Sequence, residues 1–106
     1  MPMYTYSIVT YGFQVDADSS TKARKALVFC SDGEGLRGWL TFYDDSTPIP
    51  APSLDGNLRI SLSYPMSQFG TVMELLRTEK PLHIYYYSPT FAGISSGSEP
   101  VGEEET

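Results

Sequence analysis

Only one stretch of this 106-residue chain has the hydrophobic period of a helix. Its apolar positions follow the spacing i, i+3, i+4, i+7, and they are Phe69, Val72, Met73 and Leu76. This spacing is typical of an amphipathic helix that buries one side, so we expect the four side chains to be buried against a sheet. Pro65 or Ser67 is suited to begin the helix, and Pro81 must end it. The remaining chain must therefore build its core from strands.

Five or six segments have the composition of β-strands. They cover residues 4–16, 22–31, 36–43, 58–64 and 82–88, with 90–95 as a short last strand. Within residues 4–16 the apolar positions change parity, which predicts a bulge or bend near Ile8–Thr10, or else a strand that is apolar on both faces. Residues 44–57 contain three prolines, which cannot donate to a ladder, and predict a long loop of functional or disordered character.

The order of these segments predicts an α+β fold with mainly antiparallel β structure. The first three strands are joined by short turns and are expected to form an antiparallel meander. We expect a bent sheet, or a small open barrel or sandwich, of five or six strands, with one helix between strands four and five. Residues 1–95 are expected to form a single globular domain, and residues 96–106 a flexible acidic tail that carries four glutamates.

The charge of the chain argues against nucleic-acid and membrane partners. The net charge is −6, and the only cluster of cations is Lys22, Arg24 and Lys25, which is too small to neutralise a phosphate backbone. No apolar stretch approaches the ~20 residues that span a bilayer, and no signal peptide is recognisable at the start of the chain. We therefore expect a soluble, cytoplasmic protein that binds neither nucleic acid nor membrane.

The segment from Asp32 to Asp45 contains Gly33-x-Gly35-x-x-Gly38, which has the spacing of a dinucleotide-binding fingerprint. That fingerprint needs a helix after the glycines, because the helix N-terminus holds the pyrophosphate. Here a strand follows. The glycines therefore predict a hairpin turn at Gly33 and Gly35, and a bulge or a close approach of a bulky neighbour at Gly38.

No constellation of catalytic or metal-binding residues is visible. The chain has one histidine, His83, and one cysteine, Cys30, and no pattern of metal ligands. Cys30 lies in an apolar run without a cationic neighbour, so we expect it to be buried and slow to react. The carboxylates of Asp44 and Asp45 are adjacent, but they lie in a turn where they are expected to be solvated. We expect no cofactor, no metal and no enzymatic activity.

The fourteen aromatic residues are the most informative feature. In residues 36–43 and 82–88, one parity is apolar and is assigned to the core. The opposite parity carries large amphipathic rings and polar groups, and these positions are the candidate binding or interface surface: Arg37, Trp39, Tyr43, His83, Tyr85 and Tyr87. Tyr, Trp and Arg are enriched at interface hot spots. The alternative is that these rings fill a second core in a rolled sheet.

These observations favour a non-enzymatic interaction or binding module. One helix covers one face of a small sheet at most, so the second aromatic face, or an open sheet edge, is available for self-association. We expect a homodimer, with a further protein partner as an open possibility. The 44–57 loop is the next candidate surface. The alternative is a small-ligand or lipid-binding barrel lined by the same tyrosines, and the third hypothesis is an enzyme whose site the sequence does not reveal.

Overall fold

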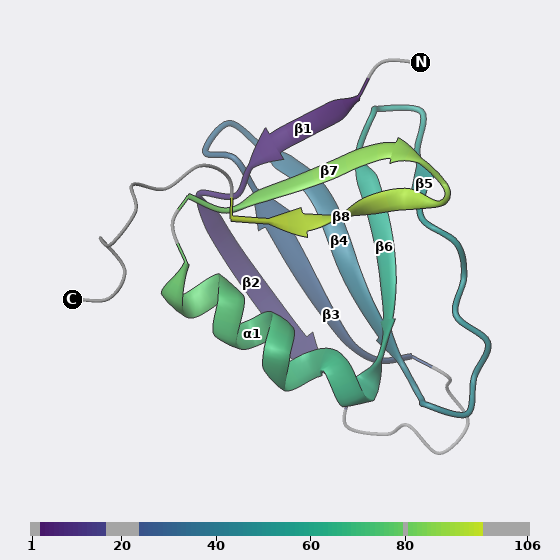
Figure 1. Cartoon of the computed structure of the whole chain (residues 1–106). Coiled ribbons are helices and arrows are strands. Elements are labelled where there is room, and N and C mark those ends of the chain that lie inside the picture. Colours follow the sequence, from purple (N-terminus) through teal and green to yellow (C-terminus); the bar gives the residue numbers. More distant parts are fainter. Residues whose placement is uncertain (1–2, 17–23, 80, 97–106) are drawn as a thin grey trace.

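The computed structural model describes residues 3–16, 24–79 and 81–96, which form two sheets and one α-helix. The elements are β1 (Tyr4–Ser7), β2 (Thr10–Val15), β3 (Arg24–Ser31), β4 (Leu36–Tyr43), β5 (Ser53–Leu54), β6 (Ile60–Pro65), the 3-10 helix η1 (Met66–Gln68), α1 (Phe69–Thr78), β7 (His83–Ser88) and β8 (Phe91–Ser95). The α+β class with mostly antiparallel pairing is confirmed. The two sheets face each other without closing, so the sandwich is the observed form (Figure 1).

The larger sheet has five strands in the order β2-β3-β4-β6-β5. Strands β2, β3 and β4 form the expected antiparallel meander, with Phe29 opposite Trp39 between β3 and β4. Strand β6 pairs parallel to β4, which the sequence analysis did not anticipate. A parallel pair requires the chain to return along the length of the strand before it pairs again. The proline-rich loop makes this return, and two of its residues, Ser53 and Leu54, form a short antiparallel strand on β6.

The first predicted strand, residues 4–16, is two strands in different sheets. The predicted bend is present: the N–H of Ile8 donates to the carbonyl of Leu82 (2.8 Å), while the N–H of Val9 donates to the carbonyl of Ser31 (2.8 Å). Consecutive residues thus hydrogen-bond to opposite layers. The chain thus passes from β1 in the smaller sheet, whose order is β1-β7-β8, to β2 in the larger sheet. This change of sheet lets Tyr6 and Tyr11 both pack against the core.

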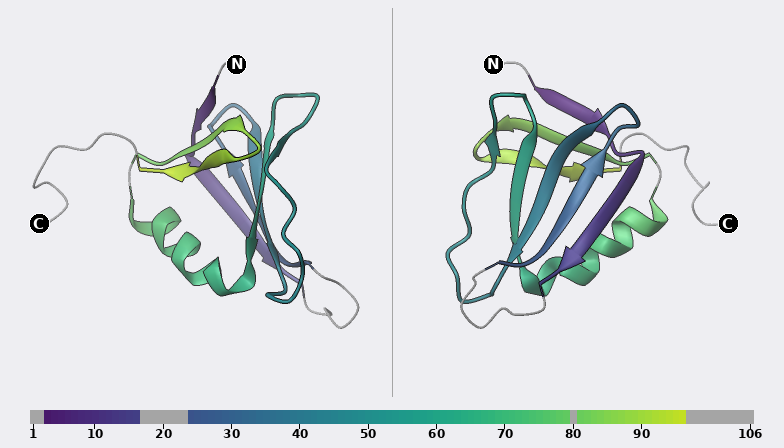
Figure 2. Two further views of the ribbon diagram at one scale, coloured as in Figure 1. Left: turned by 45° about the vertical axis from the view of Figure 1, so that its right-hand side comes forward. Right: turned by 180° about the vertical axis from the view of Figure 1, so that it is seen from behind.

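Helix α1 and the smaller sheet lie on the same side of the five-stranded sheet (Figure 2). The helical stripe points to the core as expected: Val72 and Leu76 are buried, while Phe69 and Met73 are half-buried against it. The ring of Phe69 meets that of Phe42 edge to face, with the centroids 5.0 Å apart. The helix ends at Thr78, before Pro81.

The core lies between the two sheets and the helix. Its fully buried side chains are Ala26, Val28, Cys30, Leu40, Phe42, Ile60 and Ile84. Leu58, which the alternation of residues 58–64 assigns to the core, is instead 44% exposed. Its φ of 63° continues the turn at Asp55–Asn57, so that β6 begins only at Ile60. The predicted acidic tail lies, apart from Ser96, outside the described residues.

Candidate functional site

Most of the predicted surface residues are divided between the outer faces of the two sheets, which point in opposite directions. Trp39 and Tyr43 point outward from the five-stranded sheet, and His83, Tyr85 and Tyr87 point outward from the three-stranded sheet. The parities assigned to residues 38–43 of β4 and to β7 are therefore correct, because Leu40, Phe42 and Ile84 lie in the core. The two aromatic sets do not converge, since the core of the molecule lies between them.

The outer face of the five-stranded sheet is defined by two rows of side chains that cross its strands. One row is Gly12, Phe29, Trp39 and Ser61, and the next is Gln14, Leu27, Thr41 and Ser63. Phe29 and Trp39 are therefore direct cross-strand neighbours at the centre. No described helix or strand covers this face, which is turned toward the viewer in the right-hand view of Figure 2. Leu27 and Phe29 are not among the predicted surface residues, although both can be placed from the sequence because Phe29 and Trp39 are equidistant from the turn at Glu34.

The chemistry of this outer face is that of an uncharged surface with an aromatic centre. Its two rows hold no ionisable group. Charge enters at the two ends of the sheet. At one end Arg59 donates to the carbonyl of Leu36 (3.3 Å), and at the other the Arg24 guanidinium donates to both oxygens of Asp16 (3.0 and 3.2 Å) beside Tyr43. Hydrogen bonding by Asp16 raises the pKa of Arg24, which keeps the guanidinium charged. A partner on the face would therefore not have to desolvate a charge at its centre.

Arg37 does not belong to this outer face, which corrects the sequence assignment. The register changes between the pairs Cys30–Gly38 and Ser31–Leu36, so Arg37 is the extra residue of a β-bulge. Its Nε donates to Asp32 (2.6 Å), and its guanidinium lies 5.0 Å from the centroid of the Tyr6 ring in the opposite sheet. Arg37 thus connects the two layers at one end of the sandwich.

The glycine motif forms the hairpin turn that the sequence predicts. Asp32 accepts the backbone N–H groups of Glu34 (2.9 Å) and Gly35 (3.2 Å), and these bonds together with Arg37 lower the pKa of its carboxyl. Gly33 has a φ of 93°, which favours glycine. Gly38 is a close approach, because a Cβ there would lie 2.5 Å from the carbonyl oxygen of Ile60.

The outer face of the three-stranded sheet carries a cluster of three rings. Phe91 contacts Tyr85 and Tyr87 edge to face, with centroids 5.6 and 5.8 Å apart. Tyr85 also lies over Gly93, where a Cβ would come within 3.2 Å of its hydroxyl oxygen. His83 and Tyr85 contribute to a groove of about 400 Å³, whose other lining residues are Met3, Thr5, Phe91 and Ser95. The tyrosines that the barrel hypothesis places in an interior ligand cavity therefore face outward.

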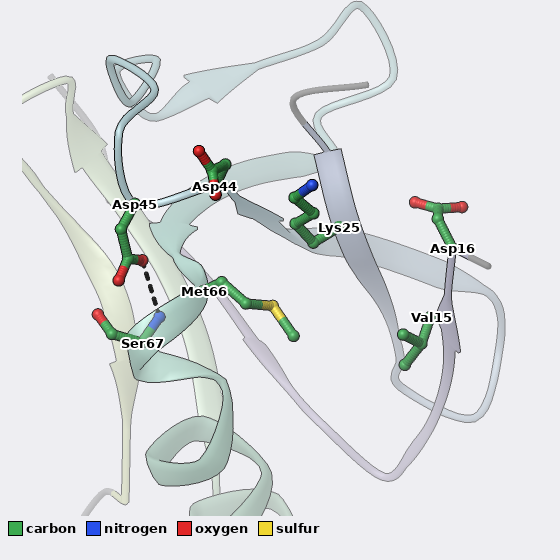
Figure 3. Close-up of a pocket in the computed structure, with 7 residues that line it drawn as sticks. All are labelled: Val15, Asp16, Lys25, Asp44, Asp45, Met66 and Ser67. Carbon is green, nitrogen blue, oxygen red and sulfur yellow. Dashed lines mark hydrogen bonds between the residues drawn. The ribbon is translucent and has the colours of Figure 1, made fainter. Parts of the chain in front are cut away.

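A cavity of about 510 Å³ opens near the end of the five-stranded sheet, and three carboxylates line it, with Asp16 across the cavity from Asp44 and Asp45 (Figure 3). Each of them has a local partner. Asp45 accepts a hydrogen bond from the backbone N–H of Ser67 (3.0 Å), which attaches the loop to η1. Asp16 accepts a hydrogen bond from the Arg24 guanidinium. A hydrogen bond from Ser46 lowers the pKa of Asp44. The carboxylates at Asp44 and Asp45 therefore hold local structure, and within the described residues no group of three or more His, Cys, Asp or Glu side chains is placed to hold a metal.

Cys30 is completely buried in the core, as the sequence predicts. Burial raises the pKa of its thiol to about 12, so the nucleophilic thiolate is scarce at neutral pH. His83 lies on the far side of the smaller sheet. The structure thus does not place the two residues in one site.

Comparison with known proteins gives no relative: no family model, no curated protein and no solved structure matches the chain. Within the part of the chain that is described, no helix is long and apolar enough to cross a membrane.

Proposed function

We propose that the protein is a non-enzymatic interaction module that self-associates through the outer face of its five-stranded sheet. The observation that carries this proposal is the pairing of Phe29 with Trp39 at the centre of an uncharged face that no described element covers. Large aromatic side chains at the centre of a patch, with small polar residues around them, are typical of interface hot spots.

The surroundings of this aromatic pair support a protein partner. On one side lie Gly12 and Gln14 of β2, and on the other side lie Ser61 and Ser63 of β6. These side chains are short or uncharged, so they allow a flat surface to approach the rings. Two sheets pack face to face at a distance of about 10 Å when their facing side chains interdigitate.

A second copy of the chain is the occupant that the charge distribution favours. Twofold association brings the same patch against itself, so a patch with a net charge would repel its copy. The two rows of this face carry none. Four strands at a spacing of about 4.8 Å and five residues at about 3.3 Å span roughly 300 Å² on each copy. That area is small for a specific interface, so we expect a reversible dimer at micromolar concentrations.

The test uses two aromatic residues on opposite sides of the molecule. Trp39→Ser should halve the molecular mass seen by light scattering at high micromolar concentration, because it removes the centre of the patch. Tyr85→Ser is the control on the outer face of the smaller sheet and should keep the wild-type mass, and the double variant should behave as Trp39→Ser. Circular dichroism checks that each variant folds. A folded Trp39→Ser protein with wild-type mass, or a monomeric wild type, rejects the proposal.

A further inference from the structure

The two edge strands of the five-stranded sheet differ in length and composition. At one edge, the two-residue strand β5 pairs with β6, and the segment with Pro48, Pro50 and Pro52 that leads to β5 runs outside this edge (Figure 1). Short edge strands and prolines are devices that block further pairing. At the other edge, β2 (Thr10–Val15) has six residues without a proline or a charged side chain. Among the described strands, only β3 pairs with β2.

The hydrogen-bonding groups of β2 point alternately toward β3 and away from it. The N–H of Asp16 donates to the carbonyl of Lys25 at 2.9 Å, just beyond the ladder. In an antiparallel pair, residues two apart direct their groups the same way, so Gln14 and Gly12 also bond to β3. Tyr11, Phe13 and Val15 therefore direct their N–H and C=O groups toward the open edge.

The same strand exposes apolar side chains next to that edge. Phe13 is 55% exposed and Val15 is 56% exposed, although both lie on the inner side of the sheet, where the helix packs. Val9, just before the strand, is 63% exposed. A groove of about 280 Å³ lies between the start of β2 and the end of α1, and it is lined by Ile8, Val9, Tyr11, Leu76, Arg77, Glu79 and Leu82. A strand added beside β2 would cover these side chains and fill this groove.

We propose that β2 pairs edge to edge with β2 of a second copy, about a twofold axis that passes through Phe13. Two antiparallel copies of β2 must keep their inner side chains on the same face of the joined sheet. They must also align the N–H and C=O groups that point toward the open edge. An axis at Phe13 satisfies both conditions, because Phe13 faces Phe13 of the partner subunit and Tyr11 faces Val15 of the partner subunit. These are the residues whose hydrogen-bonding groups face the open edge.

The neighbouring axis, at Gly12, pairs fewer of the outward groups. It would bring Val15 opposite Val9 of the partner subunit, whose N–H already donates to the carbonyl of Ser31, so only Tyr11 and Phe13 could pair with each other. With the axis at Phe13, Val15 of the partner subunit falls beside Tyr11, at the mouth of the groove of about 280 Å³. Strand β2 thus supplies both the edge and the strand that fits it, and this is why a second copy is the occupant.

This edge contact goes beyond the outer-face contact and is independent of it. The axis of the edge contact is perpendicular to the sheet, whereas the axis of a face-to-face contact is parallel to it. Both contacts can therefore form in the same particle, whose mass then exceeds that of a dimer.

The test introduces like charges on the axis. Phe13→Lys places two lysines opposite each other and should halve the mass of the wild-type particle in light scattering at high micromolar concentration. Phe91→Lys is the matched control, because Phe91 is 51% exposed, belongs to the smaller sheet and should keep the wild-type mass. A Phe13→Lys protein that folds and keeps the wild-type mass overturns the proposal.

The two contacts are separated by comparing variants. If only the outer-face contact forms, Trp39→Ser is monomeric and Phe13→Lys keeps the wild-type mass, which overturns the edge contact alone. If only the edge contact forms, Phe13→Lys is monomeric and Trp39→Ser keeps the wild-type mass. Should Phe13→Lys fail to fold, amide exchange of the wild type decides. The N–H groups of Tyr11, Phe13 and Val15 should become protected as the protein concentration rises, and rapid exchange at all concentrations would contradict the proposal.

Discussion

The two faces of the five-stranded sheet are both apolar, but they differ in what lies opposite them. On the inner face, Val28 and Leu40 are completely buried under α1 and the smaller sheet. On the outer face, Phe29 and Trp39 are at least as large and apolar, yet they are only half-buried by their neighbours. Alternation alone thus identifies two faces, whereas the packing of other elements determines which face is the core.

The largest difference between the faces is expected for a matched pair of phenylalanines. Phe42 is completely buried and contacts the rings of Phe69 and Tyr64. Phe42→Ala should lower the free energy of unfolding by about 3–5 kcal/mol, because it leaves a cavity in the core. Phe29→Ala on the outer face should cost about 1 kcal/mol or less at low protein concentration. Denaturant melts measure both, and equal losses would show that the outer face is a second core.

A matched pair of glycines sharpens the comparison. A Cβ at Gly38 would lie 2.5 Å from the Ile60 carbonyl oxygen and 2.7 Å from Cδ1 of Ile84, so the inner face has no space for it. Gly38→Ala should destabilise the protein by about 1–3 kcal/mol through overpacking. At Gly12 on the outer face, nothing lies within 4 Å of an added Cβ. Gly12→Ala should change the free energy of unfolding by less than about 0.5 kcal/mol. A Gly38→Ala protein as stable as the wild type would disprove the close approach.

The smallest effect is expected from the inner-face thiol. Burial raises the pKa of Cys30 to about 12, so its stabilising contribution is complete below the ordinary thiol pKa near 9 and is lost as the pH rises toward 12. Between pH 8 and pH 10 the wild type should lose about 1 kcal/mol more stability than Cys30→Ala. Denaturant melts at both pH values test this. Parallel losses in the two proteins would mean that the thiol ionises without unfolding.

Local patterns determined much of the fold. Strand β4 (Leu36–Tyr43) has the bounds that the sequence predicts, because its turn residues and its alternation agree. The helical stripe at Phe69–Leu76 and the turn at Gly33 are confirmed for the same reason. These features depend on backbone preferences and periods that a short segment contains in full.

Only the tertiary structure decided how these segments combine. The exchange between sheets at Ile8–Val9, the parallel pairing of β4 with β6 and the bulge at Arg37 all depend on contacts between residues far apart in the chain. The parity of a strand says which side chains share a face, and it is a property of that strand alone. Whether Trp39 and Tyr85 meet depends on which sheet receives each strand, and here the core separates them.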